Sequence, residues 1–329
     1  MDKVKLIAGR SNKPLAQGIA SILGKQLVNC TIDSFANGEI NIEVRENIRG
    51  ASVFIIQSGG SDKMNSINDY ILETLLLIDC CKRSDVAKVG IIVPCFPYSR
   101  ADKKDKSRVS IGGSMVANIL KKAGCDRIIS LDLHAGQIQG FVQQMPFDNL
   151  YGIKLHIDNL QNTIFKGLSL EEINSKYVLV SLDVGGGKRI KEYAKRLNMR
   201  YSIMDKQRDY SKNNVVLKSV LIGEVTGKIA ICIDDLADTA GTIISGVSDL
   251  KKHGALSAII LVTHGVFSNP AAERLNSCDF IEQVIVINTL DQTQNQINIP
   301  KLKVIDSSPL LSEVIKRITV GGSISELFE

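Results

Sequence analysis

The sequence predicts an α/β protein of two tandem domains, each built on a mostly parallel β-sheet flanked by helices. Three observations lead to this prediction. Short β-branched apolar runs alternate with amphipathic stretches along the whole chain. The apolar runs are nearly continuous, as in strands that are buried on both faces. A strand–loop–helix–strand pattern occurs once in each half, and 329 residues suit two domains of ~100–200 residues.

The elements follow from hydrophobic periodicity. The runs that predict strands are residues 4–8, 53–57, 89–93, 128–133, 177–182, 229–233, 258–263 and 284–287. Helical spacing in residues 65–81 places five side chains on one face, namely Ile67, Ile71, Thr74, Ile78 and Cys81. Residues 115–120 and 190–197 show the same spacing. Strands separated by helices favour parallel pairing.

The repeated pattern is carried by two similar helix ends. Leu120-Lys121-Lys122-Ala123-Gly124 leads into a strand that ends at His134, and Leu250-Lys251-Lys252-His253-Gly254 leads into one that ends at His264. A chance echo is the alternative to two related domains. We expect the domains to span 1–150 and 151–329, with the boundary near residues 150–156.

Composition and charge narrow the kinds of partner that the protein is expected to bind. Apolar and charged fractions of 44% and 23% are those of a globular chain rather than a disordered one. The net charge of +5 is concentrated in residues 100–108 and 188–212. Aromatic residues make up 5% and do not interleave with the basic runs, so we expect small polyanions rather than nucleic acid as partners. A solvated basic surface is the alternative.

The location is expected to be cytoplasmic. No apolar run approaches the ~18 residues of a membrane span, and the first residues lack the apolar core of a secretory signal. The seven cysteines are scattered without a C-x-x-C pair, which favours small buried side chains in a reducing compartment. No membrane partner is expected.

Residues 231–242 carry the strongest chemical signal. An apolar strand leads to Asp234 and Asp235, and the small-residue loop that follows opens a helix; its members are Asp238, Thr239, Ala240, Gly241 and Thr242. Backbone N–H groups of such a loop and the positive end of the helix can hold a phosphate. The two acids would then face sugar hydroxyls, because they repel the phosphate. The alternative is an ordinary helix N-cap at Asp238 or Thr239, which does not account for the other two acids.

A second strand is followed by a glycine-rich loop at residues 183–187. Gly185 and Gly186 permit close approach of an oxyanion, and Asp183 could hold Mg²⁺. The loop matches neither a Walker A motif nor G-x-G-x-x-G, and an ordinary tight turn is the alternative.

Other candidates lie after the remaining strands. His134 ends a third strand, where open α/β sheets place their sites, although a lone histidine is more often structural. Arg100, Lys103 and Lys104 lie in the loop after residues 89–93. Lys206 and Arg208 lie in a polar stretch long enough to move as a lid. A solvated loop is the alternative for both basic segments.

Together these segments resemble the ribose-phosphate diphosphokinase family, also called phosphoribosyl-pyrophosphate synthetases. The resemblance covers nearly the whole chain and is carried by residues 93–98, 102–108, 132–134, 137–141 and 234–242. The last motif alone is shared with phosphoribosyltransferases, whereas the combination is specific to the synthetases.

The resemblance implies a fold, an activity and an assembly. The fold would be two tandem phosphoribosyltransferase-like, Rossmann-type domains. The enzyme would transfer the diphosphate of ATP to the C1 hydroxyl of ribose 5-phosphate, giving 5-phosphoribosyl 1-diphosphate and AMP for nucleotide biosynthesis. Mg²⁺ would be the cofactor, phosphate an activator, and the assembly a homohexamer built from dimers.

The resemblance also implies roles for individual residues. Ribose 5-phosphate would be bound by the residues of the strongest motif, Asp234, Asp235 and Asp238–Thr242. The positions implied for ATP are Phe35, Asn37 and Glu39 of one chain with Arg100 of another, and His134. Mg²⁺ would be held at His134 and Asp183, with Gly185 and Gly186 serving the diphosphate. Lys206, Arg208 and His134 would be catalytic. The regulatory anion site would comprise Arg49, Arg108, Gln139, Asn149 and Ser323.

The sequence departs from the family pattern at three places near the implied nucleotide and diphosphate sites. Ala101 replaces a glutamine that helps to hold adenine, Leu182 replaces the proline before Asp183, and residues 109–114 lack the usual proline and lysine. Two alternatives therefore stay open. One is a non-catalytic regulatory homologue that binds catalytic subunits, and the other is a phosphoribosyltransferase, which the internal repeat disfavours.

Overall fold

The computed structural model describes residues 3–209 and 215–328, with the backbone alone described for 206–209 and 215–219. The chain forms two compact units. Unit 1 comprises Met1–Tyr151, Asn288–Asp291 and Asp306–Glu329, and unit 2 comprises Gly152–Ile287 and Gln292–Ile305. The first change of unit lies between Tyr151 and Gly152. The C-terminal segment, which we expected in the second domain, belongs instead to unit 1.

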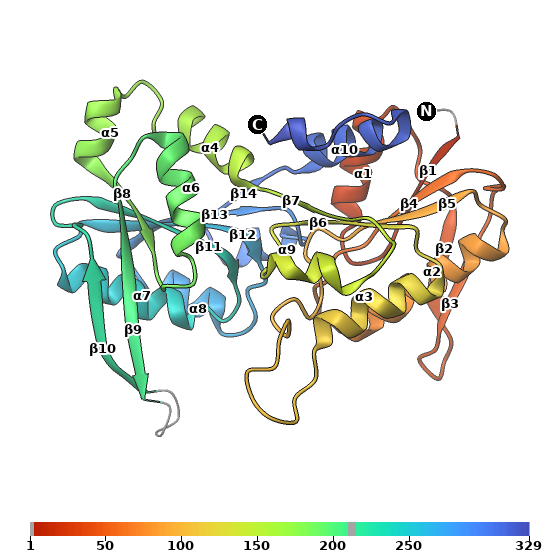
Figure 1. Cartoon of the computed structure of the whole chain (residues 1–329), viewed down its shortest axis with the longest axis horizontal. Coiled ribbons are helices and arrows are strands. Elements are labelled where there is room, and N and C mark those ends of the chain that lie inside the picture. The colour runs from red at the N-terminus through yellow and green to blue at the C-terminus, as the bar shows by residue number, and fades with distance from the viewer. Residues whose placement is uncertain (1–2, 210–214, 329) are drawn as a thin grey trace. The chain divides into compact units, whose positions relative to one another are not determined.

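Unit 1 is built on a five-stranded parallel sheet. Its strand order is β1 (Val4–Ala8), β4 (Ser52–Ile56), β5 (Lys88–Ile92), β6 (Arg127–Leu131) and β7 (Phe147–Leu150). Helices α1 (Lys13–Ile22) and α10 (Ser308–Val320) lie on one face of this sheet, and α2 (Ile67–Arg83) and α3 (Gly112–Ala123) on the other (Figure 1). Both faces are covered, which explains why these strands read as continuous apolar runs.

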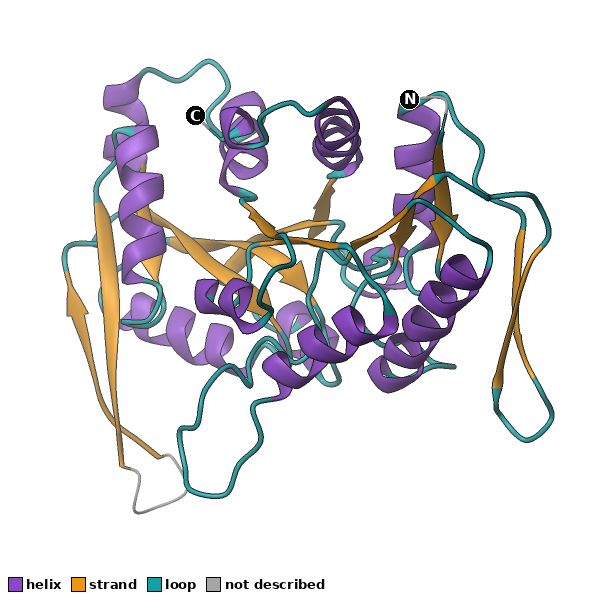
Figure 2. Ribbon diagram, turned by 45° about the vertical axis from the view of Figure 1, so that its right-hand side comes forward, coloured by secondary structure: helices purple, strands orange, loops and turns teal. Residues whose placement is uncertain are grey.

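Three smaller elements complete unit 1. A separate antiparallel hairpin is formed by β2 (Cys30–Ser34) and β3 (Ile40–Val44). The short 3₁₀ helices are η1 (Gly136–Phe141) and η2 (Ser325–Leu327). Figure 2 shows the hairpin extending away from the parallel sheet.

The turn from β1 into α1 is fastened to α2 by a buried carboxylate. Glu73 has no exposed surface, and its side chain accepts hydrogen bonds from Arg10 N (2.8 Å), Arg10 Nε (2.6 Å) and Gln57 Nε2 (2.8 Å). Gln57 in turn accepts a hydrogen bond from Ser11 N at 3.0 Å. A buried charge is tolerated where it is paired and hydrogen-bonded in this way.

Unit 2 is built on a seven-stranded sheet. Its order is β10 (Val215–Ile222), β9 (Tyr201–Asp209), β8 (Tyr177–Ser181), β11 (Ile229–Ala237), β12 (Ser257–Gly265), β13 (Ile281–Ile287) and β14 (Leu302–Ile305). All neighbours are parallel except β9 and β10. The sheet has a core on each face: Val178 and Val180 pack into one, and Leu179 into the other.

Helices cover both faces of the unit 2 sheet. α4 (Ile153–Asn162) and α6 (Gly187–Leu197) lie on one face, and α7 (Gly241–Lys252) and α8 (Ala271–Asn276) on the other (Figure 1). The remaining helices are α5 (Leu170–Lys176) and α9 (Thr293–Asn298). None of the helices in the described part of the chain combines the length and the apolar character that a bilayer crossing requires.

The strand order of unit 2 changes direction beside β8. The strand that follows it in the chain, β9, lies on one side of β8, whereas the next parallel strand, β11, lies on the other. Open α/β sheets bind ligands outside the carboxyl ends of the strands at such a switch point. The loops that follow β8 and β11 are therefore the expected ligand loops of this unit.

The internal repeat is present as two strand–helix–strand units. β5, α3 and β6 form the first, and β11, α7 and β12 form the second. Gly124 and Gly254 follow the two helices with φ angles of 112° and 83°, a backbone conformation that glycine adopts without steric cost.

Candidate functional site

The acidic pair lies within β11 rather than after it. The strand extends to Ala237, so Asp234 and Asp235 are its sixth and seventh residues, and Asp234 is in register with Val262 of β12. Asp235 is buried and Asp234 partly so. Asp235 N donates a hydrogen bond to Asp234 Oδ1 at 2.8 Å. The extra strand length fixes both carboxylates on the rigid sheet.

A cation from the neighbouring helix joins the pair. Arg189, in the first turn of α6, places its Nη1 3.0 Å from Asp234 Oδ1 and 3.3 Å from Asp235 Oδ1. All three side chains are at most 28% exposed, so solvent screens the contacts less than on an open surface. The helix after the glycine-rich loop is thereby tied to the carboxyl end of β11.

The carboxyl group of Asp234 binds its proton unusually tightly. Burial, followed by the hydrogen bond and the negative charge of Asp235, raises the pKa of Asp234 to about 7, while Arg189 acts in the opposite direction. Two neighbouring acids titrate as a pair, and one proton is retained to a higher pH than for an isolated aspartate.

The loop after β11 opens α7 without a side-chain cap. The N-cap position is Ala240, whose φ of 59° and ψ of 6° are left-handed and whose methyl side chain makes no cap hydrogen bond. Asp238 and Thr239, the alternative cap residues, precede this N-cap position in the chain. A left-handed alanine is strained, and such strain is concentrated at functional sites. First-turn N–H groups without a side-chain cap can serve a bound phosphate.

Arg274 of α8 supports this loop from outside the motif. Its Nη1 donates a hydrogen bond to the Thr239 carbonyl oxygen at 2.8 Å, and a Cβ at Gly241 would lie 3.3 Å from the same nitrogen. The guanidinium group thus lies against the predicted phosphate loop and adds positive charge there.

The glycine-rich loop after β8 is folded around Asp183. Asp183 Oδ1 accepts the Gly186 N–H at 2.9 Å, and the Asp183 carbonyl accepts the Ser181 hydroxyl at 2.8 Å. A Cβ at Gly186 would lie 2.3 Å from Ser181 Oγ, so only glycine fits there without rearrangement. Leu182 is buried, and a Cβ at Gly246 of α7 would lie 2.8 Å from its Cδ2. The leucine that replaces proline thus anchors the loop by packing.

The exposed carboxylate of Asp183 fits a Mg²⁺ ion. Only one of its oxygens accepts the Gly186 N–H, and a carboxylate has further acceptor positions. Mg²⁺ is typically held by one or two carboxylates together with waters and substrate phosphates. This agrees with the finding that the described residues contain no group of three or more His, Cys, Asp or Glu side chains that could hold a metal alone. His134 belongs to unit 1 and Asp183 to unit 2.

The predicted catalytic cations lie on a strand. The backbones of Lys206 and Arg208 belong to β9, where they pair with Ser219 and Val216 of β10. The polar stretch that we expected to be a loop therefore begins as an antiparallel hairpin. The side chains of Lys206 and Arg208 lie outside the described part of the structure.

The residues expected at adenine are gathered at one hairpin tip. Phe35, Asn37 and Glu39 form the connection between β2 and β3, where Phe35 N donates to Glu39 O at 2.8 Å and Glu39 N to Asn37 Oδ1 at 3.2 Å. The Phe35 side chain is 56% exposed. An exposed aromatic ring on a protruding tip is suited to stack on a base.

The remaining predicted residues of unit 1 lie at the carboxyl ends of β5 and β6. Arg100, Lys103 and Lys104 are exposed in the loop between β5 and α3, and His134 is exposed after β6. The Ala101 carbonyl accepts the Gly113 N–H at 3.1 Å. Ala101, which replaces the glutamine of the family pattern, therefore contacts the first turn of α3.

The structure brings two of the five predicted regulatory residues into contact. Gln139 Oε1 accepts the Asn149 N–H at 3.2 Å. Arg49 lies 3.7 Å from Asp85, and Arg108 is exposed with a φ of 63°. Ser323 is exposed too, and its carbonyl accepts a hydrogen bond from an arginine of α10 at 2.6 Å.

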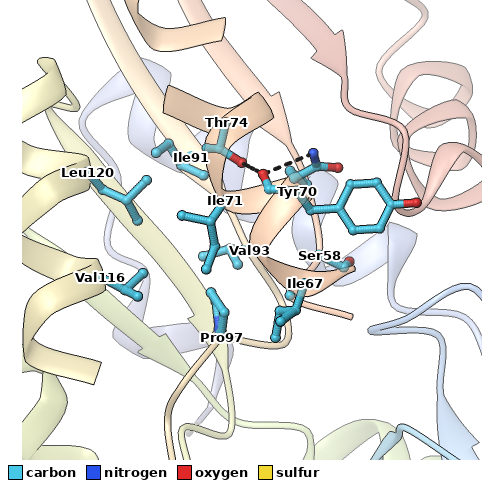
Figure 3. A pocket seen from close by; sticks show the side chains of 12 residues that line it. Ser58, Ile67, Tyr70, Ile71, Thr74, Ile91, Val93, Pro97, Val116 and Leu120 are labelled. Atoms are coloured by element: carbon cyan, nitrogen blue, oxygen red, sulfur yellow. Dashed lines mark hydrogen bonds between the residues drawn. The ribbon is translucent and has the colours of Figure 1, made fainter. Parts of the chain in front are cut away.

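A narrow, partly open pocket of unit 1 is too small to hold a substrate. It measures about 20 Å³ and lies among α2, α3 and the ends of β4 and β5, with a mostly apolar lining. Figure 3 shows Ile71, Val93, Pro97, Val116 and Leu120 around it. This volume is close to that of a single water, so the cavity is a packing defect rather than a nucleotide site.

Sequence reasoning missed two cations of unit 2. Arg189 was visible in the glycine-rich motif, but its partners lie 45 and 46 residues away. Arg274 lies 35 residues after Thr239 and carries no motif of its own. Only the fold brings either side chain to the carboxyl end of β11.

Similarity to known proteins extends over almost the whole chain. The N-terminal domain of ribose phosphate pyrophosphokinase matches residues 4–124, and the phosphoribosyl synthetase-associated domain matches residues 211–329. Phosphoribosylpyrophosphate synthetase from Mycobacterium smegmatis is 35% identical, with a TM-score of 0.87 over 97% of this chain and 100% of that chain. Purine phosphoribosyltransferase from Pyrococcus horikoshii Ot3 is 18% identical over 36% of this chain and 75% of its own, with a TM-score of 0.27. The two mainly parallel sheets flanked by helices thus form the phosphoribosyltransferase-like fold of these synthetases, and the chain belongs to the ribose-phosphate pyrophosphokinase family.

Proposed function

We propose that the chain is a magnesium-dependent ribose-phosphate diphosphokinase. It transfers the diphosphate of ATP to the C1 hydroxyl of ribose 5-phosphate and releases 5-phosphoribosyl 1-diphosphate and AMP. One observation supports this above the others: in a member of this family, a carboxylate pair on β11 is followed, after a three-residue loop, by a helix whose N-cap residue is a left-handed alanine.

Ribose 5-phosphate binds at the carboxyl end of β11 in this proposal. The 5-phosphate accepts hydrogen bonds from the loop of Asp238, Thr239, Ala240, Gly241 and Thr242. Each charge-assisted hydrogen bond contributes about 1.5–3 kcal/mol, so three of them correspond to roughly millimolar to micromolar affinity. Asp234 and Asp235 accept hydrogen bonds from the ribose hydroxyls.

The transfer depends on positioning and charge. The C1 oxygen forms a bond to the β-phosphorus, the bond from that phosphorus to the oxygen bridging to the α-phosphate breaks, and the hydroxyl proton is lost. Such transfers proceed in line through a transition state with spread charge. Lys206 and Arg208 stabilise that charge and help to exclude water.

Magnesium is the proposed cofactor. When bound, it neutralises charge on the phosphate oxygens. Asp183 and His134 are the proposed ligands, and Asp183 is the better match because Mg²⁺ prefers oxygen. Gly185 and Gly186 allow the transferred diphosphate to approach the backbone of the loop.

Nucleotide binding, assembly and regulation follow the family in this proposal. The adenine lies between Phe35, Asn37 and Glu39 of one chain and Arg100 of another, which requires self-association, with a homohexamer built from dimers as the proposed form. Arg49, Arg108, Gln139, Asn149 and Ser323 bind a regulatory anion, with phosphate as activator. The enzyme acts in the cytoplasm, without nucleic-acid or membrane partners.

The test is product formation. Purified protein with ATP, Mg²⁺, inorganic phosphate and ribose 5-phosphate should release AMP and 5-phosphoribosyl 1-diphosphate. Ribose, which lacks the 5-phosphate, is the matched control and should give no AMP. A folded, assembled protein that forms no AMP under these conditions would rule out the catalytic proposal.

Ala101 favours one second candidate. The departure from glutamine would suit a regulatory homologue that binds catalytic subunits without turning over ATP. That homologue would release no AMP alone and would change the activity of a co-purifying catalytic relative. The retained acids of β11 argue against it, because a subunit without turnover has no need for them.

A further inference from the structure

Arg189 connects the two ligand loops of unit 2. It lies three residues after Gly186 of the glycine-rich loop, and its Nη1 contacts Asp234 Oδ1 and Asp235 Oδ1 at 3.0 and 3.3 Å. β8 and β11, the strands that lead into these loops, are the two at the switch point of the sheet. A single side chain therefore spans the place where this fold binds its ligands.

The contact with Arg189 reduces the repulsion between the carboxylates of Asp234 and Asp235. Two neighbouring carboxylates repel each other, and Arg189 opposes the rise in the pKa of Asp234 that burial and Asp235 cause. The Arg189 guanidinium is always charged, and it contacts one oxygen of each carboxylate with the same nitrogen. A carboxylate has two oxygens and several acceptor positions, so one hydrogen bond from Arg189 does not by itself exhaust the acceptor capacity of either acid.

We propose that Arg189 is a positioning residue for the pentose. It holds the carboxylates of Asp234 and Asp235 in the orientation in which both accept ribose hydroxyls, and it ties this site to the diphosphate loop. The inference rests on the proposed function, because it takes ribose 5-phosphate as the ligand of the β11 acids. In this proposal Arg189 acts through the two aspartates and does not itself contact the substrate.

The experiment compares three variants. Arg189→Met removes the cation and keeps much of the packing volume, Arg189→Lys keeps the charge but loses the planar geometry, and Lys191→Met removes an exposed charge from the same helix. The expected result for Arg189→Met is a rise of about tenfold or more in KM for ribose 5-phosphate, with KM for ATP within about twofold. Arg189→Lys should fall between wild type and Arg189→Met, and Lys191→Met should match the wild type.

The outcomes separate this inference from a structural role. Equal rises in both KM values, or a fall in kcat with KM unchanged, would overturn it. A lower KM in Arg189→Met would also overturn it, because Arg189 would then compete with the sugar. If Arg189→Met does not fold, Arg189→Lys decides: a wild-type KM rejects the proposal, and a raised KM for ribose 5-phosphate alone supports it.

Calorimetry with ribose 5-phosphate distinguishes the two proposals. A wild-type protein that binds the sugar but releases no AMP would refute the proposed function, and the ratio of dissociation constants between Arg189→Met and wild type would still decide the role of Arg189. A wild-type protein that releases AMP, with equal sugar affinity in both proteins, would refute the inference alone. No sugar binding by the wild type would refute both.

Discussion

The buried carboxylate of Glu73 should control the stability of unit 1. Glu73→Gln keeps the acceptor for Arg10 N and Gln57 Nε2, but it places an NH₂ group against Arg10 Nε, which now donates at 2.6 Å. The partly buried Arg10 cation loses its counter-charge. Breaking a buried ion pair from one side costs about 3–5 kcal/mol, a large part of the roughly 5–15 kcal/mol by which domains are stable.

Amide hydrogen exchange is the suitable assay because it resolves the two units. Peptides from α2 and β1 should exchange roughly a hundredfold to several thousandfold faster in Glu73→Gln, whereas peptides from β12 and β13 serve as internal controls. Glu43→Gln is the matched variant, since Glu43 also pairs with an arginine, at 2.8 Å, but on the surface. Its effect should stay below about 1 kcal/mol. Equal effects of the two substitutions would refute the reasoning.

Three further predictions concern unit 2. Asp238→Ala should weaken binding of ribose 5-phosphate far more than binding of ATP, as measured by calorimetry; equal losses would contradict a role at the phosphate. Lys206→Ala should lower kcat by about a hundredfold or more, because a transition-state contact contributes about 2.7–4 kcal/mol, and full activity in a kinetic assay would reject its role. Burial and Asp235 raise the pKa of Asp234 from 3.8 to about 7. Between pH 3.8 and about 7, the folded state therefore holds a proton on Asp234 that the unfolded state has released. Stability of unit 2 should therefore fall as pH rises from about 4 to about 7, and Asp234→Asn should flatten this slope in thermal unfolding; an unchanged slope would contradict the assignment.

The sequence predicted the elements whose pattern is local. Each of the eight apolar runs overlaps a strand, and the three helical segments overlap α2, α3 and α6, because strands and helices packed in a core repeat their apolar residues at a fixed period. The predicted fold class and the predicted family are confirmed. The two repeated helix ends were also predicted from the sequence, because the positive φ that ends such a helix is adopted most easily by glycine, which the sequence shows directly.

Elements without continuous burial escaped prediction. The β2–β3 hairpin is only partly buried, β9 carries Lys206 and Arg208, and Lys218 and Ser219 divide the apolar residues of β10 into two runs of three. β11 was predicted to end at residue 233 because acids follow, yet pairing with β12 carries it to Ala237. Tertiary pairing overrides local preference in such places.

The candidate site was predicted in its motifs but not in its supports. Asp234, Asp235 and the loop to Thr242 stand together in the sequence, and so does the loop at Asp183. Arg189 and Arg274 reach them across the fold, through contacts that no spacing rule encodes. Leu182 could be recognised as a departure from the family pattern, but its packing against α7 could not.

The return of α10 to lie beside α1 has a consequence for how the protein is made. Unit 1 lacks α10 until residues 308–320 have left the ribosome, whereas all of unit 2 precedes residue 306. Unit 2 can therefore finish folding while unit 1 still exposes the apolar surface that α10 covers beside α1. Truncation after residue 305 would damage unit 1, whose other residues are mostly far away in sequence, and leave unit 2 intact.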